Sequence, residues 1–338
     1  MECKPALFVA GDERIFFPAL VALDSIKANN PDQFDCFICF DGSKLTSEMT
    51  AALEYHQIQF IDSKLLGVDE KISQLPKMNE GRWPIEILLN WALPEYFYAK
   101  GYKHSIKVDY DILCIRPYVL SDVLPQRTVA RGLVFDINVE KEGVSKHVIQ
   151  TAIKEGIFKE GVRAYMNAGF IAFNNQLCEE SRFFERLLKI YSFISIHSPG
   201  AKLIEQLAVF FTFTTFDGGV EELDALYNHR VRWGVLVDEN LHLTAKNIHY
   251  ITSIKPWSPF DRLAIRSFVN ARQGVLFSYR AIWLEYAAKS PWFKSFCNEE
   301  PMSQEQTLGM NIIIFHNYNQ RILELEAKLK DIQQLARI

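Results

Sequence analysis

Residues 105–115 read SIKVDYDILCI, two apolar runs separated by the acidic residues Asp109 and Asp111. Side chains alternate sides along an extended chain, so the two carboxylates point to the same side. Like charges held together are costly unless a cation neutralises them, and Mg²⁺ and Mn²⁺ suit oxygen ligands of this kind. A metal there can also bridge a diphosphate. A D-x-D pattern alone can be an exposed acidic turn, but the apolar flanks favour a metal site at the end of a buried strand.

Apolar runs alternate with helical patterns on both sides of this stretch. Strands are predicted at residues 6–10, 34–40, 59–61, 105–108, 112–115, 128–136, 165–174 and 248–251, and helices at 18–28, 47–56, 83–99, 179–194 and 201–212. Such alternation predicts βαβ units and a mainly parallel sheet that binds ligands at the carboxyl ends of its strands. Gly11-Asp12 and Asp41-Gly42 follow two of these strands. Residues 139–163 are polar and weakly patterned, so we expect a loop there that could serve as a lid.

The last third of the chain is organised differently. We expect an α/β domain over residues 1–257, an aromatic-rich helical appendage over 258–316 and an amphipathic helix over 317–338. In the last segment apolar residues recur at three-four spacing, namely Ile322, Leu325, Leu329, Ile332 and Ala336. Such a heptad seam predicts either a terminal helix docked on its own domain or a coiled coil that links two copies of the chain.

Composition and charge exclude several classes of protein. Hydrophobic residues make up 49% of the 338 residues, enough for a large core, and the formal charge of −4 argues against a broad electrostatic nucleic-acid binder. Six cysteines are too few for a disulfide scaffold, and the C-x-x-C of Cys36 and Cys39 lies in an apolar strand, so we interpret both as core residues. The sequence shows neither a signal-peptide pattern nor an apolar stretch of about 18 residues. A cytoplasmic protein, soluble or peripherally attached to a membrane, is therefore expected.

A third metal ligand is predicted late in the chain. His249 lies in an apolar strand, where a lone histidine is more often a core residue than a ligand. Here Lys255 follows six residues later, and Pro256-Trp257 follow it directly. A lysine near a metal-bound diphosphate would add a second positive charge to the leaving group.

In these motifs and in their order along the chain, residues 5–260 resemble the family-8 retaining glycosyltransferases. Five blocks carry the resemblance: the opening strand ending at Gly11-Asp12, the D-x-D of 109–111, the N-A-G of 167–169, the acid-Gln pair of 205–206, and the H-x₅-K-P-W of 249–257. The resemblance implies the GT-A nucleotide-sugar-binding fold. This is an α/β fold with a mainly parallel mixed sheet flanked by helices, and here we expect a C-terminal helical extension.

The resemblance also implies roles for individual residues. Asp109, Asp111 and His249 would bind Mn²⁺ or Mg²⁺. The donor, a UDP-sugar, would be held by these ligands and by a further set consisting of Ala10, Gly11, Asp12, Arg14, Val108, Tyr110, Ala168, Gly169, Thr252 and Lys255. Four residues would border the reacting sugar, with the glutamine beneath its reacting face: Asn167, Asp136, Glu205 and Gln206.

The chain departs from the family pattern at three points. Gly11-Asp12 stands where the family has an acid pair after the first strand. The basic residue common on the helix before the D-x-D has no counterpart in residues 86–91, with Arg82 as the alternative. The glycine expected between His249 and Lys255 is absent, and Thr252-Ser253 occupy that stretch.

Together these observations predict a metal-dependent hexosyltransferase of polysaccharide biosynthesis. It would move a hexose from a UDP-sugar to a glycan or glycolipid acceptor with retention of configuration. Two alternatives stay open, a nucleotide-sugar hydrolase or nucleotidyltransferase, and an oligomerising scaffold that has lost activity. A nucleotidyltransferase would more often show a glycine-rich phosphate loop near the first strand, which Gly11 alone does not provide. Peripheral membrane contact and a homo-oligomer through 317–338 stay open, and no nucleic-acid partner is expected.

Overall fold

The computed structural model describes residues 4–76, 85–201, 203–230, 244–251, 255–257, 282–294 and Glu326. The chain divides into two compact units, the first formed by Met1–His229 with Leu243–His249 and the second by Arg230–His242 with Tyr250–Ile338. The domain boundaries expected from the sequence after residues 257 and 316 stay predictions.

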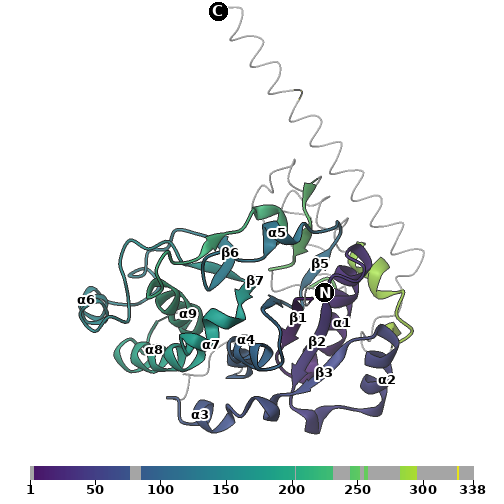
Figure 1. Ribbon diagram of the computed structural model, residues 1–338, viewed down its shortest axis with the longest axis horizontal. Helices are drawn as coiled ribbons and strands as arrows, with labels where there is room; N and C mark the ends of the chain where they lie inside the picture. Colours follow the sequence, from purple (N-terminus) through teal and green to yellow (C-terminus); the bar gives the residue numbers. More distant parts are fainter. Residues whose placement is uncertain are drawn as a thin grey trace, which may run out of the picture. The chain divides into compact units, whose positions relative to one another are not determined.

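A seven-stranded mixed sheet forms the centre of the first unit (Figure 1). Its spatial order is β3-β2-β1-β4-β7-β6-β8. The strands are β1 (Ala6–Ala10), β2 (Asp35–Phe40), β3 (Gln59–Asp62), β4 (His104–Val108), β6 (Ala130–Val134), β7 (Met166–Asn174) and β8 (Glu221–Glu222). Strands β1 to β4 run parallel, β7 is antiparallel to both β4 and β6, and β8 is parallel to β6. The mixed, mainly parallel sheet predicted from the sequence is thus confirmed.

Helices pack on both faces of this sheet. On one face α1 (Phe16–Asn29) contacts β1 and β2, and on the other α4 (Leu89–Ala99) contacts β1 and β4. Alternation along β1 explains the two layers, because Phe8 packs its ring on Phe97 of α4 and its neighbours point to the α1 side. The remaining α-helices of this unit are α2 (Ser47–His56), α3 (Asp69–Ser73), α5 (Leu120–Val123), α6 (Lys146–Lys154), α7 (Asn175–Glu180), α8 (Phe183–His197) and α9 (Ile204–Thr214).

Short elements complete the first unit. A second sheet joins β5 (Ile112–Cys114), β10 (Asn247–His249) and β9 (His229–Arg230), in which β10 lies antiparallel to β5. Single 3₁₀ turns occur at Glu13–Ile15, Gly42–Lys44, Ser63–Leu66, Ile85–Leu88 and Ala225–Asn228. Cys36 and Cys39 are buried free thiols of β2, which confirms that they are core residues.

Strand register brings distant segments to one edge of the large sheet. Phe8 of β1 lies opposite Lys107 of β4, so the residues that follow these two parallel strands emerge side by side. Val108 of β4 lies opposite Phe170 of β7, which places the middle of β7 beside Asp109. The chain after β1, the D-x-D and the N-A-G segment are therefore neighbours.

Two sequence predictions need correction. Residues 139–163 were predicted to be a loop, yet they contain α6, whose Val148 and Ala152 are buried on one side while most of the segment is polar. Two buried residues four apart are too weak a pattern to predict a helix reliably. The helix predicted at 83–99 is a 3₁₀ turn at Ile85–Leu88 followed by α4. Residues 83–84 lie outside the described part of the chain.

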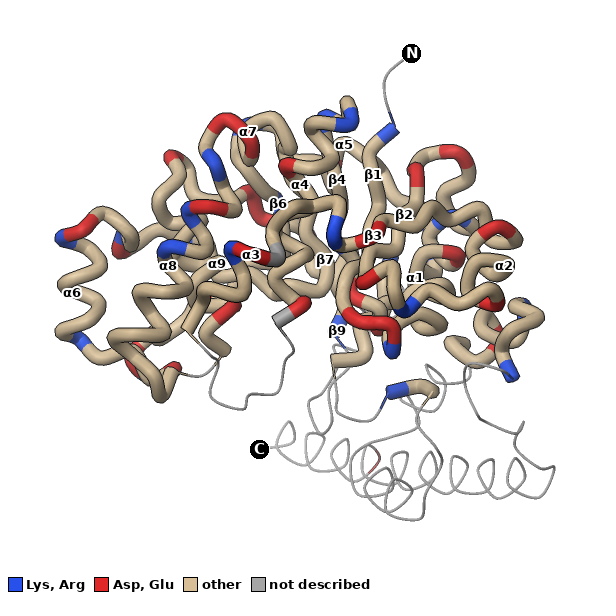
Figure 2. Tube along the Cα trace, turned by 90° about the horizontal axis from the view of Figure 1, so that it is seen from below, with Lys and Arg blue, Asp and Glu red and all other residues tan. Residues whose placement is uncertain are grey.

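The second unit is described only in part. Its Trp257 and Trp283 rings lie 5.0 Å apart, and Trp283 is buried. Nearly all of the predicted appendage and of the amphipathic helix at 317–338 lies outside the described residues. Within the described ranges, no helix combines the length and the apolar character needed to span a membrane. Lysine, arginine and acidic residues are interspersed along the described trace (Figure 2).

A candidate metal centre

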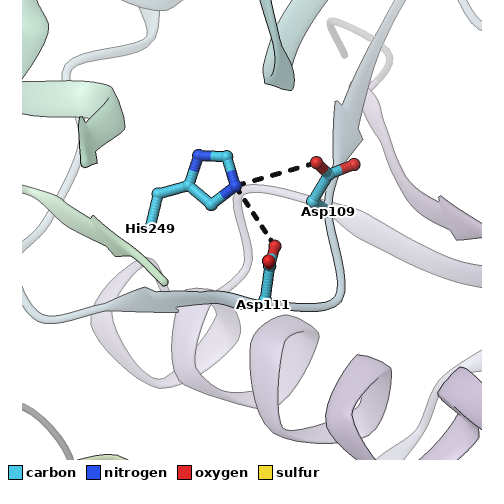
Figure 3. A group of neighbouring side chains, drawn as sticks. All are labelled: Asp109, Asp111 and His249. Atoms are coloured by element: carbon cyan, nitrogen blue, oxygen red, sulfur yellow. Dashed lines mark ion pairs between the residues drawn. The ribbon is translucent and has the colours of Figure 1, made fainter. Parts of the chain in front are cut away.

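Asp109, Asp111 and His249 converge although 137 residues separate the second from the third (Figure 3). The two acids connect β4 to β5, and pairing of β5 with β10 sets His249 opposite Ile112. The Nε2 atom of His249 lies 3.2 Å from Oδ1 of Asp111 and 3.7 Å from Oδ2 of Asp109. One ligand atom from each residue falls within 4.8 Å of the others, which makes a group that could hold a metal ion.

A buried lysine holds the other oxygen of Asp109. Lys107, only 2% exposed in β4, donates through Nζ to Oδ1 of Asp109 and to the backbone oxygen of Ala168. The backbone N–H of Asp109 donates to the oxygen of Gly169 at 2.7 Å. Asp109 therefore presents Oδ1 to Lys107 and Oδ2 to His249.

Two asparagines orient the ring of His249 and set its tautomer. Asn228 donates from Nδ2 to Oδ1 of Asn167 at 2.9 Å, and the same oxygen accepts from the Gly169 N–H at 3.1 Å. Because Asn228 uses its NH₂ there, its Oδ1 faces His249 Nδ1 at 2.8 Å and accepts a hydrogen bond from the Nδ1–H group. In the neutral ring Nε2 then carries the lone pair, directed at the two carboxylates, as in a metal-ligating histidine with a supporting hydrogen bond.

The donor set fits a divalent cation. Oδ2 of Asp109, Oδ1 of Asp111 and Nε2 of His249 face one another. In the tautomer described above, none of these three atoms carries a hydrogen. A divalent ion placed among them would be bound by all three ligand atoms. Carboxylate-rich sites suit Mg²⁺ and Mn²⁺.

Gly169 provides the space for the imidazole. A Cβ atom built on Gly169 would lie 2.2 Å from Cε1 and 2.6 Å from Nδ1 of His249. Any side chain here would displace the ring, so the glycine of the N-A-G segment is a packing requirement of the cluster.

The residues after β1 form the neighbouring edge. Asp12 accepts from the N–H of Arg14 at 2.9 Å and pairs with its guanidinium at 2.5 Å. Tyr110 is half-buried, and burial, followed by the charges of Asp111 and Asp109, raises the pKa of its hydroxyl well above its usual range. Ala10 accepts from Asn90 through its backbone oxygen at 3.2 Å, and Gly11 donates to the oxygen of Cys39 at 3.1 Å.

Helix α9 carries the predicted acid-Gln pair. Glu205 is 5% exposed, and its Oε1 accepts from the indole N–H of Trp91 at 2.5 Å. Burial raises the pKa of Glu205 to about 7, an effect that the charge of Lys107 opposes. Gln206 accepts from the hydroxyl of Tyr165 at 3.0 Å.

The remaining predicted site residues are not members of this three-residue cluster, and one of them is outside the described chain. Asp136, just beyond β6, is largely exposed and pairs with Arg163 at 3.2 Å. Val108 is buried within β4. Lys255 belongs to the second unit, where it donates to the backbone oxygen of Tyr250 at 2.7 Å. Thr252 lies outside the described residues.

Sequence reasoning missed Lys107, Asn228 and Trp91. A signal for Lys107 existed, because a charged residue two positions before Asp109 on an extended chain shares its side. Asn228 and Trp91 carried no local signal, since only the folded chain brings them to His249 and Glu205.

A cavity of about 360 Å³ opens beside Asp136. Its walls come from the segment after β6, from α6, from the segment before β7 and from α9. They comprise Phe135, Asp136, Ile137, Asn138, Val139, Glu140, Ile149, Phe158, Glu160, Gly161, Val162, Arg163, Ala164 and Phe210. Phe210 lies one helical turn after Gln206 on α9, so both residues face the same side of that helix.

Comparisons with known proteins agree with this architecture. The sequence model of glycosyl transferase family 8 matches residues 6–260. Among solved structures, the bifunctional glycosyltransferase WbbM is 14% identical with a TM-score of 0.58, over 87% of this chain and 51% of that one. The galactosyltransferase LgtC, crystallised with donor and acceptor sugar analogues, is 15% identical with a TM-score of 0.52, over 89% and 98% of the two chains. GlyE of Streptococcus pneumoniae TIGR4 is 15% identical with a TM-score of 0.51, over 88% and 63%.

These likenesses show the GT-A fold. The chain spans only about half the length of WbbM and less than two thirds of GlyE. A search of curated proteins found no match.

Proposed function

This chain belongs to glycosyl transferase family 8, and on that premise we propose that it moves a hexose from a UDP-sugar to a glycan or glycolipid acceptor with retention of configuration. The convergence of Asp109, Asp111 and His249 is the observation that carries the proposal. These three residues would hold Mn²⁺ or Mg²⁺. When bound, the ion would neutralise the diphosphate that leaves with the nucleotide.

Other residues of the chain would bind the nucleotide, stabilise the diphosphate and orient His249. Asp12 and Arg14, after β1, and Tyr110, within the D-x-D, would contact the nucleotide. Lys255 would add a positive charge to the leaving diphosphate. The Asn228–Asn167 hydrogen bond would keep Nε2 of His249 free of a proton and directed at the ion.

Retention of configuration requires either a nucleophile or attack from the leaving-group side. Glu205 is buried with one oxygen bonded to Trp91, an arrangement that supports a positioning role rather than attack on the sugar. Gln206 is polar and held by Tyr165. We therefore favour a mechanism in which Gln206 lies beneath the oxocarbenium-like sugar and the acceptor hydroxyl enters on the side of the leaving diphosphate.

The cavity beside Asp136 is where we place the acceptor. It lies one turn of α9 from Gln206, and its aromatic and aliphatic walls suit the C–H faces of a sugar ring. Three carboxylates, from Asp136, Glu140 and Glu160, outnumber the single Arg163. This charge disfavours a phosphate group and favours a neutral sugar as the acceptor end.

Calorimetric titration of UDP in the presence and absence of Mn²⁺ tests the function. We expect metal-dependent heat with the wild type, its loss in Asp111→Asn, and no change in Asp217→Asn, which alters an exposed acid whose ion pair with Lys159 is 3.9 Å long. Incubation with UDP-glucose or UDP-galactose, with and without maltose, cellobiose or chitobiose, then reports the reaction. Free sugar made at the same rate without acceptor would indicate a hydrolase, and absence of metal-dependent heat would indicate an inactive scaffold.

A further inference from the structure

Lys107 is the one lysine or arginine paired with Asp109 among the residues that the structure describes. We propose that Lys107 is a built-in counter-cation of the metal centre: it neutralises Asp109 while the metal is absent and competes with the metal for that carboxylate, with Glu205 as its balancing anion. The inference rests on the proposed metal site. It assigns a positioning role to a residue of the sheet interior that does not touch substrate.

Lys107 is buried in the sheet, so its positive charge must be compensated by nearby groups. It lies in β4 between β1 and β7, opposite Phe8 on one side and Ile171 on the other. A buried ammonium is costly unless it is paired and hydrogen-bonded. Lys107 meets that requirement through Oδ1 of Asp109 and the oxygen of Ala168, both next to the cluster.

Trp91 and Glu205 form the layer behind this lysine. The ammonium lies 6.0 Å from the centre of the Trp91 ring, within the range of a cation–π contact. The same indole donates its N–H to Glu205 at 2.5 Å. Helix α4 thus offers an aromatic ring to the ammonium that β4 supplies.

The charges of Lys107 and of the three carboxylates around it determine how strongly a divalent ion is attracted. Three ionised carboxylates and one ammonium carry a net charge of −2, which one divalent cation cancels. Without the ammonium, the acids around the cluster repel one another more strongly in the metal-free protein and attract a divalent ion more strongly. Without Glu205 the ammonium is less compensated, and it holds Asp109 and repels the ion more strongly. The two substitutions should therefore change metal affinity in opposite directions.

The test measures Mn²⁺ binding to the nucleotide-free protein at pH 8 by electron paramagnetic resonance, together with thermal unfolding with and without Mn²⁺. Lys107→Met should unfold at a lower temperature without metal, show a larger Mn²⁺-induced rise in Tm and bind Mn²⁺ about tenfold more tightly. Glu205→Gln should bind Mn²⁺ about fivefold more weakly. Lys107→Arg, which keeps the charge, and Lys100→Met, which alters an exposed lysine at the end of α4, should both stay near the wild type.

Several results would overturn the inference. If Lys107→Met lowers Tm equally with and without Mn²⁺, the lysine only packs, and if Mn²⁺ binds more weakly, it does not compete with the metal. Should Lys107→Met fail to fold, the sign of the Glu205→Gln effect decides, because unchanged or tighter binding contradicts the proposed balance. A wild type that binds no Mn²⁺ would instead remove the proposed function itself, a separate outcome.

Discussion

At the scale of single residues, the space around His249 is as important as its ligand atoms. Gly169→Ala would put a methyl group 2.2 Å from Cε1 of the ring, closer than real contacts allow. We expect Mn²⁺ binding to fall by at least tenfold, because Nε2 is displaced from Asp109 and Asp111. Electron paramagnetic resonance of bound Mn²⁺ measures this. Gly200→Ala, at an exposed position with open space around its Cβ, is the matched control, and equal binding by both variants would contradict the packing argument.

Glu205 gives the stability a pH dependence of its own. Its pKa is about 7 in the folded protein against 4.5 for an ordinary glutamate. Between these values the folded state binds more protons than the unfolded state, so this carboxyl lowers stability as the pH rises from 4.5 to 7. The loss amounts to roughly 3 kcal/mol at most.

Glu205→Gln should reduce the fall of stability with pH, since the amide does not ionise. Its oxygen still accepts the hydrogen bond from Trp91. The measurement is the free energy of unfolding by urea at pH 5 and at pH 8. The decrease in the free energy of unfolding from pH 5 to pH 8 should be smaller in the variant than in the wild type. Glu95, whose pKa burial raises to about 6, contributes with the same sign in both proteins, so only the difference between them is diagnostic. If the free energy of unfolding changes equally with pH in the wild type and in Glu205→Gln, the carboxyl of Glu205 does not have a raised pKa.

Residue identities were predictable from the sequence only where the pattern was local. Asp109 and Asp111 could be recognised from the D-x-D spacing between two apolar runs, and Gly169 from its place in the N-A-G motif. Asn228 lies 21 residues before His249 in a 3₁₀ turn, and no period or spacing connects the two. Lys107 was readable in principle, but an apolar strand with one lysine is ordinarily taken as a strand with a tolerated charge.

At the scale of elements, strands were more predictable than the pairings between them. The sequence predicts strands on both sides of the D-x-D, but it does not indicate that β4 joins the seven-stranded sheet and β5 the three-stranded one. The turn that carries the D-x-D is the link between the two sheets. That division depends on β10, far along the chain, and local propensity carries no information about it.

Helix α6 is an element whose sequence pattern was too weak to predict. Ser145 caps it by accepting from the Val148 N–H, and Ile149 on the same helix lines the cavity beside Asp136. Ile149→Trp should fill part of this cavity. If the acceptor binds there, its KM rises at least tenfold while the heat of UDP binding with Mn²⁺ stays unchanged, because the metal cluster lies elsewhere in the fold.

The control for that experiment is Gln150→Trp, the same substitution at the next position of α6, which is exposed and does not line the cavity. Acceptor kinetics with a neutral disaccharide that the wild type uses provide the measurement. A normal KM in Ile149→Trp would place the acceptor somewhere else. A loss of UDP binding would show instead that the variant has disturbed the fold around the metal cluster.

At the scale of the whole molecule, the residues proposed to bind the donor belong to two different compact units of the chain. Asp109, Asp111 and His249 all belong to the first unit, whereas Lys255 belongs to the second. The sequence could not indicate this division, because His249 and Lys255 share one short motif. Two proposed roles, holding the ion and stabilising the diphosphate, can therefore be tested separately by binding measurements.

Lys255→Met should therefore leave Mn²⁺ binding to the nucleotide-free protein unchanged, since every proposed metal ligand lies in the first unit. It should weaken UDP binding in the presence of Mn²⁺ by about tenfold and lower turnover, because one charge opposite the diphosphate is lost. Calorimetry with Mn²⁺ alone and then with UDP separates the two effects. Lys294→Met removes an exposed lysine of the same unit and should change neither quantity. Equal weakening of both steps would mean that Lys255 supports the metal ligands themselves, and an unchanged UDP affinity would exclude it from the donor site.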